Sequence, residues 1–415
     1  MAFAMFTGQC SPIAVDFGSA SVKLLQIGAG ERPSLVAAAE LAVPEPMRAD
    51  PDKLLGFYAE WVPRFIRDGK FRGKRVVIAV PSGQTFTSHM QIAETGGVSR
   101  DDLIKGQLQM QMGVQPQGVV VRSIEVGPVH RHGQTMTEMI CFAITRDTIM
   151  RYIDLLTKKC KLEVVGVHTE TLAMTRAFDH LNRRESDDKV TTLYIDLGWG
   201  GTRVAVAHGK QLRFARYVPI GGRQFDQLIA STVQCDGASA RTHRLSLQSA
   251  LAAAERTVAD AVAEPDPAAE MAAVATRSAQ GAVNRSAPSG SIGTVTLDRR
   301  VGAVPLELRH AAGCVNVDLS ELMEVMGDEL AMSLRYHQGL FGGRRIDRAI
   351  FVGGESRQAW LCHHLVKRLR VPAQLGDPLA RFQTNGIGET PGLTLGQPQP
   401  GWAVACGLCS APTDM

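Results

Sequence analysis

The chain has 415 residues, of which 45% are hydrophobic and 21% are charged. This composition is typical of a folded globular protein and excludes a disordered chain, and the length indicates two to four structural units. Lysine and arginine total 45 against 41 aspartate and glutamate residues, a formal net charge of +4. So small an excess argues against a nucleic-acid-binding protein, because basic residues would have to neutralise a row of phosphates.

No stretch of the sequence approaches the roughly 20 apolar residues that a membrane-spanning helix needs. The apolar start over residues 1–13 lacks the basic region and the cleavage site of a signal peptide. The eight cysteines are scattered along the chain, which indicates thiols in a reducing compartment rather than a disulfide framework. We therefore expect a cytoplasmic, multidomain protein without direct membrane insertion.

Two segments of the chain share one pattern, in which an apolar strand ends in Asp-x-Gly and two further strands follow. The strand-like runs lie at 12–18, 21–27 and 35–43 in the first segment and at 192–198, 202–207 and 212–218 in the second. A duplication of this kind predicts two related half-domains that face one another.

The stretch between these two segments predicts an insertion. A helix over 53–66, interrupted by Pro63, and a strand over 75–80 belong to the first half, and residues 86–160 form a compact α+β insert. We expect the insert to hold strands at 90–93, 119–126 and 139–144 and helices at 100–112 and 146–159. A strand at 164–167 and a helix at 170–180 then return to the first half, and the charged segment 182–189 is a connector.

An unusual segment over residues 235–313 interrupts the second half. Alanine is dense from 250 to 282, and Ser, Gly and Pro dominate 286–293, so we expect a marginal helical pair and a flexible loop. The apolar spacing beyond it predicts an amphipathic helix over 319–334. A strand at 346–352, a Gly-Gly turn and a helix at 358–370 follow.

Each Asp-x-Gly turn carries groups that suit a phosphate. Gly18 and Gly198 have no Cβ, so their turns can come close to a ligand and direct backbone N–H groups at an anion. Asp16 and Asp196 end the strands at the mouths of the turns, where carboxylates can hold Mg²⁺ through water. Hydroxyl groups and a positive charge come from Ser19, Ser21, Thr202 and Lys23. One such turn alone is more typical of an ordinary hairpin, whereas two of them, each opening a duplicated half, indicate a shared site.

Together these motifs resemble those of the actin-like ATPase superfamily, which includes actin, heat-shock chaperones, sugar kinases, FtsA and MreB. Its phosphate turns read Asp-x-Gly-Ser-x-x-x-Lys and Asp-x-Gly-x-Gly-x-Thr, and here they correspond to 16–23 and 196–202. Residues 351–355, Phe-Val-Gly-Gly-Glu, are similar to its adenosine turn. The resemblance implies an α/β, ribonuclease H-like duplicated fold of two lobes, with ATP and Mg²⁺ in the cleft between them.

The resemblance also implies roles for individual residues. Asp16 and Asp196 would act in catalysis and hold Mg²⁺ through water. Glu170 would lie near the attacking water, although a glutamate that starts a helix is equally well explained by the helix dipole. The residues expected to bind the nucleotide are Gly18, Ser19, Ser21, Lys23, Gly198, Gly200, Gly201, Thr202, Glu329, Gly353, Gly354 and Glu355.

Within the superfamily, the insert and its flanks are most similar to the PilM family of type IV pilus assembly proteins. The similar segments are 75–81, 141–160, 164–173, 213–222 and 403–408. The resemblance implies a first half (1A, 1–84), an inserted 1C subdomain for partner docking (85–162), a return with the connector (163–189), a second half (2A, 190–232), a small alanine-rich 2B-like subdomain (233–313), the rest of the second half (314–397) and a C-terminal helix that returns to the first half (398–415).

On this resemblance the chain is a cytoplasmic protein of the inner-membrane platform of a type IV pilus or a related secretion system, held at the membrane through partners. The implied partner is a PilN-like single-pass membrane protein, whose N-terminal peptide would dock in a groove walled by 75–80, 86–93 and 100–112. The last of these segments carries Leu103, Leu108, Met110 and Met112, which either contact the peptide or pack the insert's own core. Other platform proteins are further partners, and self-association is left open.

Three departures from the family pattern weaken the expected nucleotide site. The chain has no lysine between Lys210 and Lys367, Met332 stands where the helix usually carries an arginine, and Gly200-Gly201 replaces hydroxyl residues. We therefore expect preserved phosphate and Mg²⁺ contacts, a weakened nucleoside clamp and a weak ATPase at most. Two alternatives stay open, a nucleotide-free scaffold of the same fold and a metabolite kinase of the superfamily, for which no separate Asp motif supplies a base.

Overall fold

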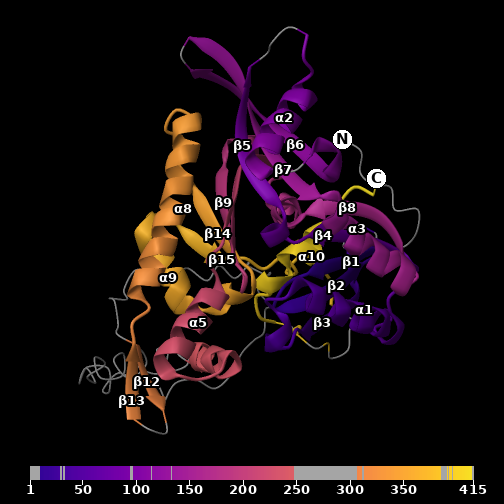
Figure 1. Cartoon of the computed structure of the whole chain (residues 1–415), viewed down its shortest axis with the longest axis vertical. Coiled ribbons are helices and arrows are strands. Elements are labelled where there is room, and N and C mark those ends of the chain that lie inside the picture. The colour runs from indigo at the N-terminus through magenta and orange to yellow at the C-terminus, as the bar shows by residue number, and fades with distance from the viewer. Residues whose placement is uncertain are drawn as a thin grey trace, which may run out of the picture.

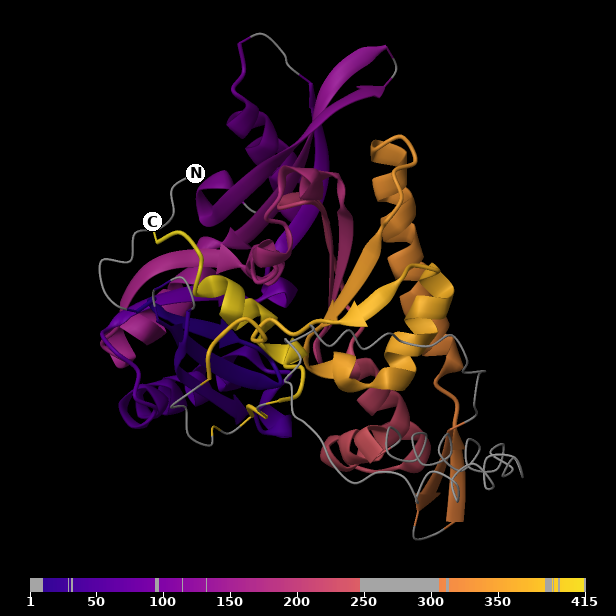
Figure 2. The same cartoon turned by 180° about the vertical axis from the view of Figure 1, so that it is seen from behind.

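Two five-stranded sheets form the centres of two lobes (Figures 1 and 2). The first sheet contains β1 (Ile13–Phe17), β2 (Ser21–Ile27), β3 (Leu35–Ala42), β4 (Arg75–Val80) and β8 (Glu163–Thr169). The second contains β9 (Thr191–Leu197), β10 (Thr202–His208), β11 (Gln211–Val218), β14 (Arg348–Val352) and β15 (Ala373–Leu375). The computed structural model describes residues 10–28, 30, 33–93, 97–113, 115–131, 133–246, 306–310, 313–384, 390, 392–394 and 396–413.

The two sheets have the same topology. Their strand orders are β3-β2-β1-β4-β8 and β11-β10-β9-β14-β15. In each sheet the first three strands along the chain are antiparallel, and the last two run parallel to the first. The match, strand for strand, confirms the duplicated two-lobed α/β fold that the sequence predicted.

Helix α1 (Pro51–Asp68) packs on the first sheet. The Asp50 side chain caps it by accepting hydrogen bonds from the backbone N–H groups of Asp52 and Lys53. Pro63 was expected to interrupt this helix, but the helix continues through it. Apolar side chains before and after Pro63 pack against the sheet, and this burial outweighs the loss of one backbone donor.

The insert is a three-stranded antiparallel sheet covered by one helix. It contains β5 (Phe86–Ala93), α2 (Arg100–Met112), β6 (Val119–Arg131) and β7 (Gln134–Thr145), and its strand order is β5-β7-β6. Helix α3 (Arg146–Asp154) and a π-helical turn (Leu155–Lys159) follow. β6 and β7 form a longer hairpin than the sequence predicted, because exposed residues toward its tip break the hydrophobic pattern before the strands end.

The second lobe is completed by helices and a small hairpin. These are α5 (Gly222–Val233), a helix over 237–246, β12 (Leu306–His310), β13 (Gly313–Val317), α8 (Ser320–Leu340) and α9 (Ala359–Leu369). Residues 247–305 lie outside the described residues, and most of the helical pair and flexible loop expected over 235–313 falls there.

Two short helices lie between the sheets, α4 (Glu170–Arg176) and α10 (Ala403–Leu408). They touch through their backbones, because a Cβ on Gly407 would collide with the carbonyl group of Ala173. The hydrophobic cluster around them includes residues of both sheets, such as Val77 and Ile350, so the lobes share part of one core. Among the residues that the structure describes, no helix is long and apolar enough to cross a membrane.

Candidate functional site

A cavity of about 520 Å³ lies between the two lobes. Its wall brings together most of the residues that the sequence singled out. They are Asp16, Gly18, Ser19, Ser21, Lys23, Glu170, Asp196, Gly198, Gly200, Gly201, Gly353, Gly354 and Glu355. Three turns that are far apart in the chain therefore meet at one site.

The two Asp-x-Gly turns are in contact across the cavity. A Cβ added to Gly200 would lie 3.1 Å from the Ser19 hydroxyl oxygen, so the two turns approach each other closely at this point. Gly353, with a φ of +88°, rests against the second turn, where a Cβ would collide with the Asp196 carboxylate. This third turn therefore needs glycine for both conformation and space.

The duplication extends to the charged residues behind each turn. In the antiparallel ladders, Asp16 lies opposite Lys23 on β1 and β2, and Asp196 lies opposite Arg203 on β9 and β10. The Lys23 ammonium donates to Ser21 Oγ at 2.7 Å and pairs with Glu40 at 3.3 Å. Lysine and arginine thus occupy equivalent places in the two halves.

Arg203 is a site residue that the sequence analysis missed. Its guanidinium donates through Nε and Nη2 to Asp196 Oδ2, at 2.9 and 2.8 Å, and through Nη1 to Glu170 Oε2 at 2.5 Å. The same Glu170 oxygen accepts a hydrogen bond from the backbone N–H of Ser82 at 2.6 Å. Although burial opposes it, the Asp196 and Glu170 charges raise the pKa of Arg203 further above its usual range.

Asp16 is left with an incompletely neutralised charge. Burial raises its pKa from an ordinary value of 3.8 to about 7, and the neighbouring carboxylates of Glu170 and Asp196 add to the increase, whereas Lys23 and Arg203 oppose it. Folding therefore takes up a proton between these two pH values. The stability that this proton provides is present at low pH and is lost as the pH rises through about 7.

We expect Asp16→Asn to remove this pH dependence. With a chelator present and no ligand, the unmodified protein should lose stability relative to the variant as the pH rises from about 4 to about 7, by up to about 1.4 kcal/mol per pH unit, and the difference should level off above that pH. Thermal denaturation of both proteins across this range measures the difference. Parallel pH profiles would show that Asp16 is ionised in the folded protein throughout.

The carboxylates suit the Mg²⁺ that the sequence predicted, provided that water mediates the contact. Asp196 Oδ1 is buried and has no partner among the described residues, and burial beside two further carboxylates raises the pKa of Asp16, which a nearby cation would lower. No group of three His, Cys, Asp or Glu side chains within the described ranges could ligate a metal directly. A hydrated Mg²⁺ beside Asp16 and Asp196 would supply positive charge against a phosphate.

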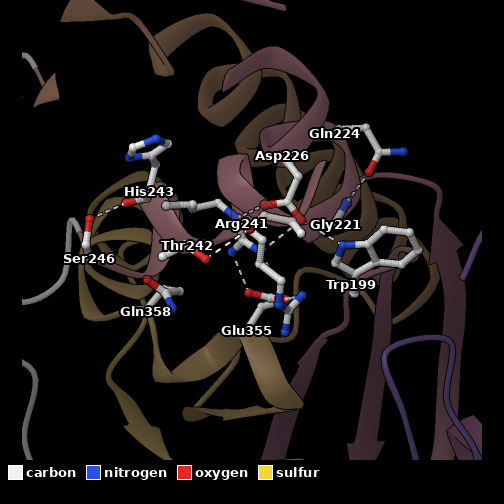
Figure 3. A network of polar contacts seen from close by, with 12 residues as sticks. Trp199, Gly221, Gln224, Asp226, Arg241, Thr242, His243, Ser246, Glu355 and Gln358 are labelled. Atoms are coloured by element: carbon white, nitrogen blue, oxygen red, sulfur yellow. Dashed lines mark hydrogen bonds and ion pairs between the residues drawn. The ribbon is translucent and has the colours of Figure 1, made fainter. Parts of the chain in front are cut away.

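The second lobe also contributes a buried ion-pair network, shown in Figure 3. Arg244, on the helix over 237–246, is 1% exposed and donates to Asp226 Oδ1 at 2.6 Å and to Glu355 Oε2 at 2.5 Å. The Trp199 indole donates to Asp226 Oδ2 at 2.7 Å, and Arg241 reaches Glu355 Oε1 at 3.4 Å. The network fixes Glu355 and the second turn against this helix.

The absence of lysine between Lys210 and Lys367 led us to expect a weakened nucleotide site in the second lobe, but arginines provide positive charge there. Arginines rather than lysines face the cavity from the second lobe, and they are Arg203, Arg223, Arg241 and Arg357. Within the segment that contains no lysine, Arg241 lines the cavity and Arg244 holds Glu355. The absence of lysine therefore does not leave this wall without positive charge.

Two predicted residues lie away from the cavity wall. Thr202 is buried, and its hydroxyl donates a hydrogen bond to the carbonyl of Ile220 at 2.7 Å, which links the start of β10 to the segment after β11. Glu329, on α8, pairs with Arg216 of β11. Neither residue is part of the cavity lining. Glu329 lies on α8, which packs beside β11. The Thr202 hydroxyl is directed at the carbonyl of Ile220, just after the end of β11.

Comparison with known proteins gives the family. Residues 14–249 match the family model described as type IV pilus assembly protein PilM. The solved structure of a PilM-PilN type IV pilus biogenesis complex is similar with a TM-score of 0.66 and 15% identity, over 97% of this chain and 98% of that chain. No curated protein sequence matches the chain.

Two further solved structures are less similar. The ethanolamine utilization protein EutJ from Carboxydothermus hydrogenoformans has a TM-score of 0.47 and 12% identity, over 97% of this chain and 90% of that chain. MreB5 of Spiroplasma citri, bound to ADP, has a TM-score of 0.42 and 10% identity, over 95% of this chain and 94% of that chain.

The duplicated lobes and the paired Asp-x-Gly turns at their interface define a protein of the actin-like class. Since the family model covers more than half of its length, the chain belongs to the PilM family of type IV pilus assembly proteins. Both the fold and the family predicted from the sequence are thereby confirmed.

Proposed function

We propose that this actin-like pilus assembly protein binds ATP in the cavity between its lobes and docks a PilN-like membrane protein on its insert. The contact between the Ser19 turn and the Gly200 turn carries the first part, because it brings two phosphate-type turns to one cavity. Backbone N–H groups of both turns, with Lys23, would bind the phosphates. Asp16 and Asp196 would hold Mg²⁺ through water, and the ion would offset phosphate charge.

Titration of the full chain with ATP in the presence of Mg²⁺ tests this part. Saturable binding of one ATP per chain that protects the protein against thermal unfolding is the expected result. If no ATP binds at millimolar concentration, the chain is instead the nucleotide-free scaffold of the same fold.

We expect ATP hydrolysis to be slow. Glu170 is the residue proposed to lie near the attacking water, and its Oε2 atom is already occupied by Arg203 and by the Ser82 N–H group. An oxygen that already accepts hydrogen bonds from a guanidinium and a backbone N–H is poorly placed to accept a proton from water. Phosphate release should stay far below the usual enzyme range of roughly 1–10³ per second, and a turnover within that range would contradict this assignment.

The docking proposal concerns the insert. The similar solved complex pairs PilM with PilN, and an extended peptide can bind by adding to the edge of a sheet. The first wall proposed from the sequence, 75–80, is unsuitable, because β4 is paired on both sides by β1 and β8 and is almost entirely buried. β6 is an outer strand of the insert sheet, 13 residues long, and β5 is the other.

Helix α2 offers apolar side chains beside this sheet. Leu108 is buried in the insert's own core, and Leu103 and Met112 pack against that core, whereas Met110 is 80% exposed. Leu103, Leu108 and Met112 therefore pack in the core of the insert itself and are not free to contact a peptide. Met110, together with the exposed Val98, is left for a partner.

We expect Met110→Glu to weaken binding of a PilN-like N-terminal peptide by about tenfold or more, because burial of a methionine is worth roughly 1.5–3 kcal/mol. Met332→Glu is the matched control, since Met332 is a 41% exposed methionine on α8 of the other lobe. A labelled peptide titrated into both variants gives the two affinities. Equal binding by both variants would place the docking site elsewhere.

A further inference from the structure

Two arginines from different lobes line the cavity beside the second turn. Arg48 precedes α1 in the first lobe, and Arg241 belongs to the helix over 237–246 in the second. The Arg48 guanidinium lies 5.5 Å from the centroid of the Trp199 ring, which places it next to the second turn. Figure 3 shows Arg241, Glu355 and Trp199 in the same region.

Arg48 is buried without full neutralisation. The residue is 9% exposed, and its Nε atom donates to the carbonyl of Val43 at 2.8 Å. Its Nη1 atom is buried and has no hydrogen-bond partner within the described ranges. Burial lowers the pKa of Arg48 and the nearby positive charge of Arg241 lowers it further, whereas the carboxylates of Asp226, Glu45 and Glu355 only partly offset the decrease. A buried cation in this state is unfavourable unless an anion binds it.

Among the described residues, the ion-pair partner of Arg241 is shared with Arg244. Its Nη1 atom is 3.4 Å from Glu355 Oε1, whereas Arg244 donates to the two oxygens of the same carboxylate at 2.5 and 3.2 Å. One carboxylate is therefore divided between two guanidinium groups. The Glu355 carboxylate pairs mainly with Arg244. The positive charge of Arg241 is therefore only partly neutralised and can attract a further anion.

The segments that carry the two arginines already touch. A Cβ on Gly237, at the start of the helix that carries Arg241, would collide with the Glu45 side chain, three residues before Arg48. The lobes are therefore close at this point. Both arginines therefore line one cavity at a place where the two lobes already approach each other.

We propose that Arg48 and Arg241 form a clamp for one phosphate group, which joins the two lobes across the cavity. The proposal rests on the proposed function insofar as this phosphate belongs to the nucleotide, and inorganic pyrophosphate offers the same chemistry. Guanidinium groups suit this task because they bind phosphate oxygens in a bidentate manner. The bound phosphate neutralises Arg48 and separates two like charges.

The clamp predicts opposite effects on stability and on binding. Without ligand, Arg48→Gln removes a buried charge that its neighbours neutralise only in part, so the melting temperature should stay the same or rise. With ligand, Arg48→Gln and Arg241→Gln should each weaken ATP binding by about tenfold or more, because each removes a charge-assisted bond. Arg64→Gln is the control, since Arg64 is an exposed arginine on α1 of the first lobe.

The experiment measures melting temperatures and the affinities for ATP and pyrophosphate of the full chain and of these three variants. A clamp is supported if both cavity variants lose affinity and Arg48→Gln keeps its stability. It is overturned if both variants bind ATP as tightly as the unmodified protein, or if Arg48→Gln melts earlier with unchanged affinity. If the unmodified protein binds no ATP, the proposed function fails. The clamp is then supported by pyrophosphate binding that the cavity variants lose, and overturned if no pyrophosphate binds.

Discussion

Replacing Arg244 with methionine is expected to lower the free energy of unfolding by about 3–5 kcal/mol. Arg244 is almost completely buried and is the closest ion-pair partner of both Asp226 and Glu355. Although burial alone would raise it, the Arg244 charge keeps the pKa of Glu355 below its usual value. The variant would leave two buried carboxylates without their main partner, which is more costly than the loss of the pair itself.

The matched control is Arg368→Met. Arg368 also pairs with two carboxylates, Asp328 and Glu324, but at a partly exposed position on α9. Ion pairs at exposed positions contribute little to stability, so this variant should unfold close to the unmodified protein in a denaturant titration. Equal losses in the two variants would show that the buried network does not hold the second turn and its helix together.

The second large effect is expected at Lys23. Lys23→Met should raise the dissociation constant for ATP by about 10- to 100-fold, because a charge-assisted bond to a phosphate is worth roughly 1.5–3 kcal/mol. Lys23 lines the cavity and lies within 2.7 Å of the Ser21 hydroxyl, in the first turn.

Lys210→Met serves as the control for Lys23, since Lys210 is exposed in the turn between β10 and β11. Isothermal titration of ATP into both variants, with melting temperatures to establish that each is folded, separates binding from stability. Unchanged affinity in a folded Lys23→Met protein would remove the first turn from the phosphate site.

The sequence predicts the parts of the site that depend on local pattern. Buried strands that end in Asp-x-Gly identified both turns, and the duplication indicated that they face one another. The pairing of Asp196 with Arg203 was also within reach, because a hairpin closed by residues 198–201 places these two residues opposite each other. The hydroxyl and glycine residues of the turn do not reveal this pairing, whereas the register of the hairpin does.

Other features depend on contacts between distant segments and have no local signal. Arg48 and Arg241 are single arginines in ordinary sequence, and only the packing of the first lobe against the helix over 237–246 brings them to one cavity. Glu329 was expected to bind the nucleotide but pairs with Arg216 instead. The amphipathic pattern of its helix does not show which residue of another strand it will face. The length of the β6–β7 hairpin was underestimated because strand pairing there continues over exposed polar residues.

A crystal structure of the full chain with a non-hydrolysable ATP analogue tests the central claim most directly. We expect phosphate oxygens within hydrogen-bonding distance of backbone N–H groups in both turns, at Gly18–Ser19 and at Gly198–Gly200, with Lys23 and the Arg48–Arg241 clamp on the same phosphate chain. An analogue bound outside this cavity, or contacting only one of the two turns, would contradict it.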